Sequence, residues 1–172
     1  MKKNIILSLL ILVFGAICFY SGISLNTLKV NDGYFLEQGY SFKTPVWAQT
    51  DELGVTAFLN EEEDNGENPF KSYVFIVKDK LEGRSFEQYI EYIKTQVQNS
   101  SQSMEVIEEK DDGNSHVVFV KTTQDDVNYI IGMSFVKGLG DTCFIVSLNT
   151  IESSFELTKP VFEETYRSFA LR

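Results

Sequence analysis

The sequence is poor in the residues that most often carry enzyme chemistry, because its 172 residues include one histidine and two cysteines. Cys18 lies in an apolar leading run and cannot reach Cys143 without leaving a membrane, so we expect no structural disulfide. Cys143 has no histidine or basic neighbour in the apolar run 142–148, which predicts a buried, unreactive thiol. His116 begins a strand-like run and is predicted to be an ordinary sheet residue, since one histidine makes neither a two-histidine metal site nor a recognisable triad.

Basic runs and phosphate-binding motifs are also missing. The net charge is −10, and removing the two positive charges of Lys2 and Lys3 leaves −12 on the rest of the chain. Nucleic acids bind through stripes of lysine and arginine, so this composition argues against a nucleic-acid partner, and anionic lipid headgroups would be repelled. Gly138 and Gly140 are too closely spaced, and lie between two strand-like runs, to form a glycine-rich nucleotide loop. No cofactor is indicated.

The one long uncharged stretch is at the amino terminus. Residues 5–25 carry no charge and follow Lys2 and Lys3, which predicts a membrane-spanning helix with its leading end in the cytoplasm and the body of the chain outside. Gly22 and Ser24 offer a small-residue pattern for signal peptidase, so residues 1–25 are either a retained transmembrane anchor or a cleaved signal that leaves a secreted or periplasmic protein. A buried helix in a larger assembly is the third alternative. A lipid anchor on Cys18 is disfavoured, because the bulky Ile17 precedes it.

Residues 26–32 are predicted to be a spacer, and residues 33–172 a single domain of the α+β class. Apolar residues make up 43% of the chain, which is enough for a core without disulfide or metal staples. Period-two patterns and intervening turn residues predict strands over 34–43, 55–60, 70–77, 104–110, 115–123, 127–137 and 142–150. The strand over 70–77 is apolar on both faces, and the last four runs read as an antiparallel meander.

Two helices are predicted among these strands. Ser85 and Gln88 form a capping box before an apolar face at helical spacing over residues 86–97. A second, short helix is expected over 160–169, with Pro160 near its first turn and Phe162, Tyr166 and Phe169 on one face. The order of elements predicts an antiparallel β-sheet with helices packed on its faces, rather than a Rossmann-type domain.

This layout resembles the PsbP/DcrB-like family, a set of small α-β-α sandwich domains often found behind a signal or lipid anchor in bacterial envelopes. The resemblance is in Tyr-Ser-Phe-Lys-Thr-Pro-Val-Trp at 40–47, Ser-Phe-Glu-Gln-Tyr-Ile at 85–90 and the segment 162–169, and it covers residues 33–172. It brings no catalytic residues. What it implies is varied non-enzymatic work, namely that of photosynthetic oxygen-evolving accessory subunits, periplasmic proteins, secretion-effector chaperones and a Ran-binding import factor.

Carboxylates supply the metal-site candidates. The acidic run 61–67 contains Glu61, Glu63, Asp64 and Glu67 around a glycine, and oxygen ligands of this kind can wrap calcium, although their spacing is not that of an EF-hand. We interpret the run primarily as a solvated loop. A second set of acids lies in predicted turns of the meander, where turn chemistry explains them and a metal site is the alternative: Asp111, Asp112, Asp125, Asp126 and Asp141.

Two functions follow from the sequence. The first is a non-catalytic, membrane-tethered binding or accessory module of the bacterial cell envelope with a protein partner, in which Trp47 is either a packing residue or the edge of a binding surface. The second is an extracytoplasmic metal-dependent hydrolase that uses the clustered carboxylates. The absence of a recognisable catalytic constellation favours the first, and the protein is predicted not to be an enzyme.

Overall fold

The computed structural model describes residues 30–31, 33–37, 39–50, 57–64, 66, 68, 70–100 and 104–172. The predicted anchor or signal, residues 1–25, and residues 26–29 and 32 of the predicted spacer lie outside these ranges. Within the described ranges, no helix is long and apolar enough to cross a membrane.

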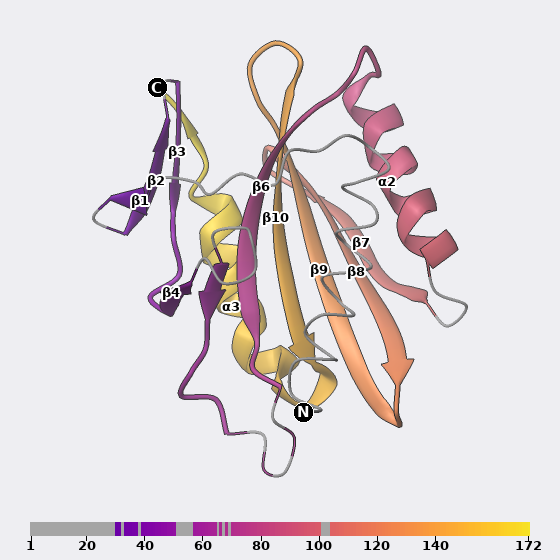
Figure 1. Ribbon diagram of the computed structural model, residues 1–172. Coiled ribbons are helices and arrows are strands. Elements are labelled where there is room, and N and C mark those ends of the chain that lie inside the picture. Colours follow the sequence, from indigo (N-terminus) through magenta and orange to yellow (C-terminus); the bar gives the residue numbers. More distant parts are fainter. Residues whose placement is uncertain are drawn as a thin grey trace.

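The central sheet has seven strands, each antiparallel to its neighbours (Figure 1). Their spatial order is β4-β5-β6-β10-β9-β8-β7, so β7 to β10 form the predicted meander and β6 pairs with the outer side of β10. The bounds are β4 Ala48–Thr50, β5 Ala57–Leu59, β6 Tyr73–Lys80, β7 Glu105–Asp112, β8 Ser115–Gln124, β9 Val127–Lys137 and β10 Thr142–Ile151. The prediction for β7 ended two residues too early, at 110.

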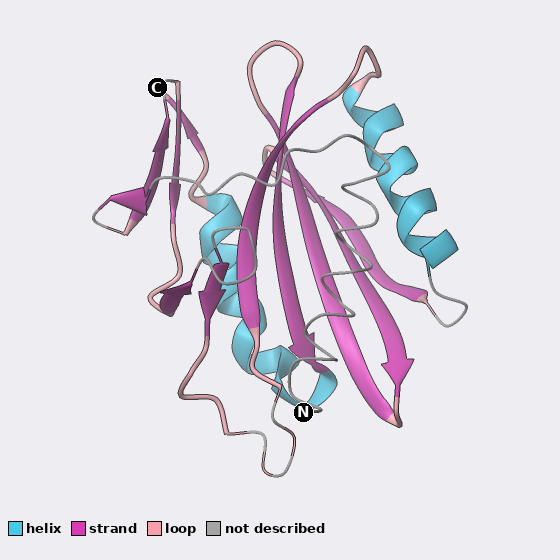
Figure 2. Ribbon diagram, viewed as in Figure 1, coloured by secondary structure: helices cyan, strands magenta, loops and turns pink. Residues whose placement is uncertain are grey.

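Both faces of the central sheet are buried. In β6, Tyr73 and Phe75 belong to an apolar cluster on one face, whereas Val74 and Ile76 belong to a cluster on the other. Successive side chains of a strand point to opposite faces of its sheet, so β6 contributes to both clusters. The strand is apolar on both faces, as predicted, because both faces are covered. One helix lies on each side of the sheet (Figure 2), which confirms the predicted α+β class.

The α2 helix (Phe86–Ser100) covers the first face and begins as predicted. The backbone N–H of Gln88 donates to Ser85 Oγ at 3.2 Å, and the backbone N–H of Ser85 donates to Gln88 Oε1 at 2.9 Å, which is a complete capping box. The buried side of α2 carries Tyr89, Ile90, Ile93 and Val97, all of which belong to the cluster on this face.

The α3 helix (Phe155–Arg167) covers the second face and starts five residues before the predicted position. A 3₁₀ turn, η1 (Glu152–Ser154), leads directly from β10 into the helix, and the Phe155 ring then packs edge-on against Phe119 at 5.2 Å. Pro160 therefore lies inside the helix and not in its first turn. Tertiary packing of Phe155 extends the helix beyond the point where the proline suggested that it begins.

A second, four-stranded sheet with the order β1-β2-β3-β11 lies on the α3 side and was not predicted. The predicted single strand over 34–43 is a hairpin, because Gly39 adopts a φ of 91° that permits a reversal there. The predicted helix over 160–169 also ends early, and the chain continues into β11. The bounds are β1 Val30–Asn31, β2 Tyr34–Glu37, β3 Tyr40–Lys43 and β11 Ala170–Leu171.

Candidate functional site

The β7 strand forms one edge of the central sheet and is held by charged side chains on both faces. After the bulge between Val106 and Glu108, alternate residues face α3 and α2 in turn. Charged side chains on an edge strand hinder pairing with a foreign strand. This edge is therefore protected, and its charges serve to attach both helices to the sheet.

The contacts with α3 end at Asp112, which the sequence placed in a turn but which belongs to β7. Its Oδ2 accepts hydrogen bonds from Arg167 Nη2 at 2.6 Å and from the Tyr166 hydroxyl at 2.7 Å. These bonds, chiefly that from Arg167, hold the pKa of the Asp112 carboxyl below its usual value. Further along, Lys159 Nζ contacts Glu108 Oε2 at 2.8 Å.

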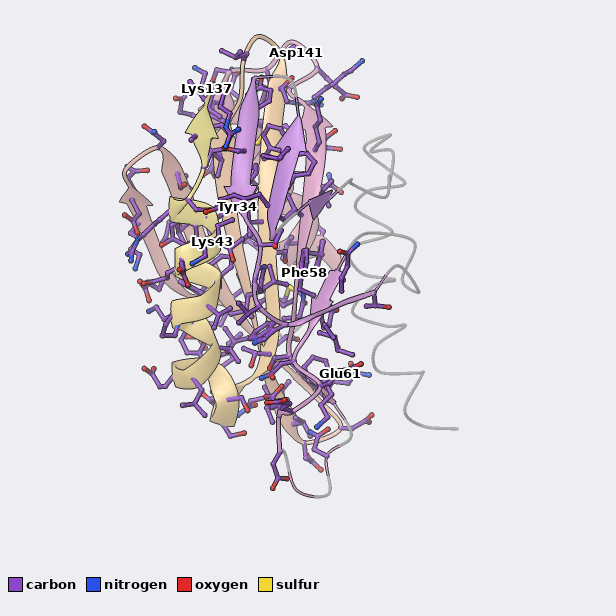
Figure 3. All side chains as sticks on the ribbon, turned by 90° about the vertical axis from the view of Figure 1, so that its left-hand side faces the viewer. Tyr34, Lys43, Phe58, Glu61, Lys137 and Asp141 are labelled. Carbon is purple, nitrogen blue, oxygen red and sulfur yellow. The ribbon has the colours of Figure 1, made fainter. Side chains whose placement is uncertain are left out.

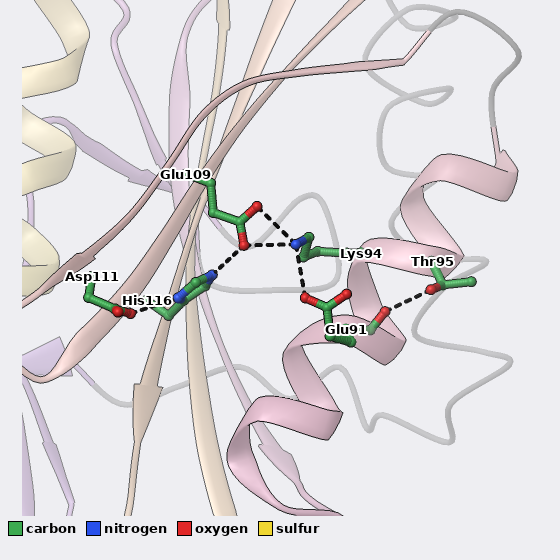
Figure 4. Close-up of polar contacts among 6 residues, drawn as sticks. All are labelled: Glu91, Lys94, Thr95, Glu109, Asp111 and His116. Atoms are coloured by element: carbon green, nitrogen blue, oxygen red, sulfur yellow. Dashed lines mark hydrogen bonds and ion pairs between the residues drawn. The ribbon is translucent and has the colours of Figure 1, made fainter.

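The single histidine is linked to α2 through Glu109 (Figure 4). His116 Nδ1 lies 2.8 Å from Asp111 Oδ1, and Nε2 lies 2.9 Å from Glu109 Oε1, so each ring nitrogen is within hydrogen-bond distance of a carboxylate. Glu109 also accepts from Lys94 Nζ at 2.7 Å, and Lys94 reaches Glu91 at 2.9 Å. The hydrogen bond from Lys94 lowers the pKa of Glu109. His116 is thus a bridging residue in a charged chain that joins β8, β7 and α2.

A cleft of about 480 Å³ opens beside His116 and Asp111. Four segments build it: the start of α2, the turn between β7 and β8, the end of β9, and the C-terminal strand β11. Phe86, Phe169 and Leu171 supply apolar surface, and Glu87 and Lys137 supply charge. The pKa of Glu87 is lowered by its own backbone N–H and by the Ser85 hydroxyl, so the carboxylate is ionised in the neutral range.

The turn between β9 and β10 adjoins this cleft at Gly138 and carries an exposed leucine. The turn between β9 and β10 is fixed by Tyr40, whose hydroxyl accepts a hydrogen bond from the Leu139 N–H and contacts the Leu139 carbonyl at 3.4 Å. Leu139 is nevertheless 55% exposed, and Leu171 is 58% exposed. Figure 3 places Lys137 and Asp141 at this end of the molecule.

The acidic loop lies at the opposite end of the sheet, where Figure 3 shows Glu61. Glu61 and Asp64 are exposed, and Glu67 lies outside the described residues. Glu63 points inward and is 9% exposed. Its carboxylate accepts hydrogen bonds from the backbone N–H of Ser72 and from Ser72 Oγ at 2.9 Å, so it anchors the loop to β6.

The five meander aspartates do not converge. Asp111 contacts His116 and Asp112 contacts Arg167, whereas Asp125 and Asp126 form the turn between β8 and β9 with φ values of 49° and 62°. Asp141 lies in the turn between β9 and β10, at the other end of the meander from Asp125. In the described part of the chain, no group of three or more histidine, cysteine, aspartate or glutamate residues is placed to hold a metal ion.

Two further predicted residues have packing roles. Trp47 is partly buried and packs against the apolar cluster under α3. Cys143 is buried, as predicted, and burial strongly raises the pKa of its thiol. The cleft itself was not predicted. Its apolar residues gave no separate signal, because Phe86 and Phe169 each read as the core face of a helix.

The fold is that of the PsbP/DcrB-like proteins. No protein-family model matches the chain, and no curated protein matches its sequence. The likeness is to solved structures and concerns the fold alone, because the sequence identities are low.

Three solved structures illustrate the similarity in fold. The cyanobacterial PsbP protein CyanoP from Synechocystis sp. PCC 6803 is 18% identical, with a TM-score of 0.53 over 81% of this chain and 91% of that one. LpqN, which is involved in cell envelope biogenesis of Mycobacterium tuberculosis, is 7% identical, with a TM-score of 0.55 over 84% and 81%. A variant of the protein Mog1 is 14% identical, with a TM-score of 0.52 over 83% and 96%.

Proposed function

We propose that this protein is a non-catalytic binding or accessory module, which its N-terminal segment tethers to the outer side of a bacterial cytoplasmic membrane. The cleft at the end of the central sheet carries the binding part of this proposal. Its mixture of aromatic, leucine and charged surface is suited to a protein partner. Near the cleft, the ion pairs Lys94–Glu109 and Arg167–Asp112 attach α2 and α3 to the sheet.

The membrane part rests on Lys2, Lys3 and the uncharged run 5–25. LpqN, which shares the fold, works in envelope biogenesis, and this is compatible with an envelope role for the present chain. Protease treatment of intact spheroplasts should digest the domain, and the intact mass of the isolated chain should show whether residues 1–25 are retained. Protection of the domain in spheroplasts together with digestion after lysis would place it in the cytoplasm and refute the orientation.

The binding part is tested by photo-cross-linking in cells that naturally carry the protein. A photoreactive amino acid at Asn114, in the cleft, should give one dominant adduct. The same amino acid at Ser153, an exposed position at the opposite end of β10, is the matched control and should not. Equal adducts from both positions, or none from Asn114 at any expression level, would contradict binding through the cleft.

A further inference from the structure

The β11 strand borders the cleft, and in the part of the chain that the structure describes no second strand pairs with its other side. Among the described residues, β11 is the last strand of the four-stranded sheet and pairs with β3 alone, in the register Ala170↔Ser41 and Leu171↔Tyr40. Leu171 also lines the cleft. The strand with this unpaired side is therefore part of the wall of the cleft.

The ladder between β3 and β11 fixes the direction of the Leu171 backbone. The N–H of Arg172 donates to the Gly39 carbonyl at 2.9 Å, so this pair is a hydrogen-bonded one. Hydrogen-bonded and non-hydrogen-bonded pairs alternate along an antiparallel ladder, which makes Leu171↔Tyr40 a non-hydrogen-bonded pair. The N–H and C=O of Leu171 consequently point away from β3, toward the open side of the strand. They are the groups with which an additional strand would pair.

The side chains around this edge specify what the additional strand carries. Phe86 and Phe169 offer apolar surface beside Leu171. Glu87 and Asp111 are exposed carboxylates, and Lys137 is the one lysine of the cleft. Asp111 contacts His116 through Oδ1, and its side chain is 88% exposed, so it can still contact a basic side chain. The chain as a whole carries a charge of −10, so long-range attraction also favours a cationic segment.

We infer that the cleft receives an extended segment of a partner protein, which adds to the open edge of β11 as a strand and carries an apolar side chain next to a basic one. Main-chain bonds to Leu171 give the segment its direction. Its apolar side chain packs against Phe86 and Phe169, and its basic side chain reaches Glu87 or Asp111. This inference rests on the proposed function and adds the chemical class of the partner.

The experiment measures fluorescence anisotropy of labelled six-residue peptides with the 172-residue chain. A peptide of alternating valine and lysine should bind about tenfold more tightly than one of alternating valine and glutamate, and an analogue N-methylated at every residue should lose binding. Leu171→Pro removes the outward N–H but leaves the pairing of Ala170 and Arg172 with β3, and it should weaken binding about tenfold. The control substitution is made at Leu157 in α3, where proline would disrupt the helix. Alanine is therefore used at both positions, and Leu171→Ala is compared with Leu157→Ala.

Leu157 is an exposed leucine of α3 and does not line the cleft, so Leu157→Ala should bind within about twofold of the natural chain. The inference is overturned if the valine–lysine peptide does not bind at about 1 mM, or if the N-methylated analogue binds equally well. It is also overturned if neither Leu171→Pro nor Leu171→Ala changes the affinity for the peptide. If the Asn114 adduct nevertheless persists in the Leu171→Pro chain, the partner binds the cleft without strand addition. In that case the proposed function stands and the inference fails.

Discussion

Replacing Glu63 with alanine tests whether the acidic loop is a structural anchor or a cation site. Glu63 accepts two hydrogen bonds from Ser72, which is itself fully buried. The Ser72 hydroxyl lies 2.7 Å from Thr150 Oγ1, and the Thr158 hydroxyl donates to the same Thr150 oxygen at 3.2 Å. The carboxylate therefore ends a buried polar chain that joins the loop, β6, β10 and α3.

The expected loss of stability follows from these contacts. Hydrogen bonds to charged groups contribute about 1.5–3 kcal/mol each, and a buried donor without an acceptor costs about 1–3 kcal/mol. In Glu63→Ala the Ser72 hydroxyl keeps Thr150 as a partner, but the Ser72 N–H loses its acceptor. We expect the free energy of unfolding to fall by about 2–4 kcal/mol. A loss of about 3 kcal/mol corresponds to a Tm lower by about 6–12 °C for a chain of this size.

Urea unfolding and thermal melts, each with and without calcium, provide the measurement. Glu61→Ala removes an exposed carboxylate from the same loop and should change stability by less than about 0.5 kcal/mol. Calcium should leave the Tm of the natural chain unchanged, because both oxygens of Glu63 already accept hydrogen bonds. Equal effects of the two substitutions would refute the anchor. A calcium-dependent rise in Tm that Glu63→Ala abolishes would establish a cation site instead.

Three further predictions concern the core, the β7 edge and the thiol. A Cβ at Gly132 would lie 2.8 Å from Phe119 Cε1, so Gly132→Ala should lower the free energy of unfolding by about 1–3 kcal/mol in urea, and an unchanged midpoint would contradict this packing. Because Arg167 lowers the folded-state pKa of Asp112, the stability from this pair is full above the unfolded pKa of about 3.9 and is lost as the pH falls through the folded pKa. Tm measured against pH should thus fall less steeply at acid pH in Asp112→Asn, and parallel curves would refute the role of the pair. Cys143 should react with a thiol reagent at the rate of unfolding, and fast labelling of the folded chain would show that it is accessible.

Local patterns predicted most of the secondary structure. The capping box before α2 and the four runs of the meander depend on contacts within a few residues, or on the period of the apolar pattern, and both can be read along the chain. The errors occurred where packing overrides local preference. Pro160 suggested a helix start that Phe155 moves upstream, and Gly39 divides what reads as one strand into a hairpin.

The site was much less predictable. Its residues come from α2, the turn between β7 and β8, the end of β9, and β11, and none of these segments carries a motif of its own. Phe86 and Phe169 have helical spacing in the sequence and were expected to be core. The inward orientation of Glu63 could not be predicted either. A run of acidic residues predicts a solvated loop, whether or not one of them accepts a hydrogen bond from a buried donor such as Ser72.

The sequence by itself determined the composition of this protein, the order of most of its elements and the two-sided burial of β6. Hydrophobic periodicity and turn chemistry are local properties, and they suffice for those features. Only the tertiary structure decided that residues 170–171 pair with residues 40–41, that β7 is tied to both helices, and that a cleft forms at the end of the sheet. These features depend on contacts between distant parts of the chain, whose formation is governed by the packing of the whole core.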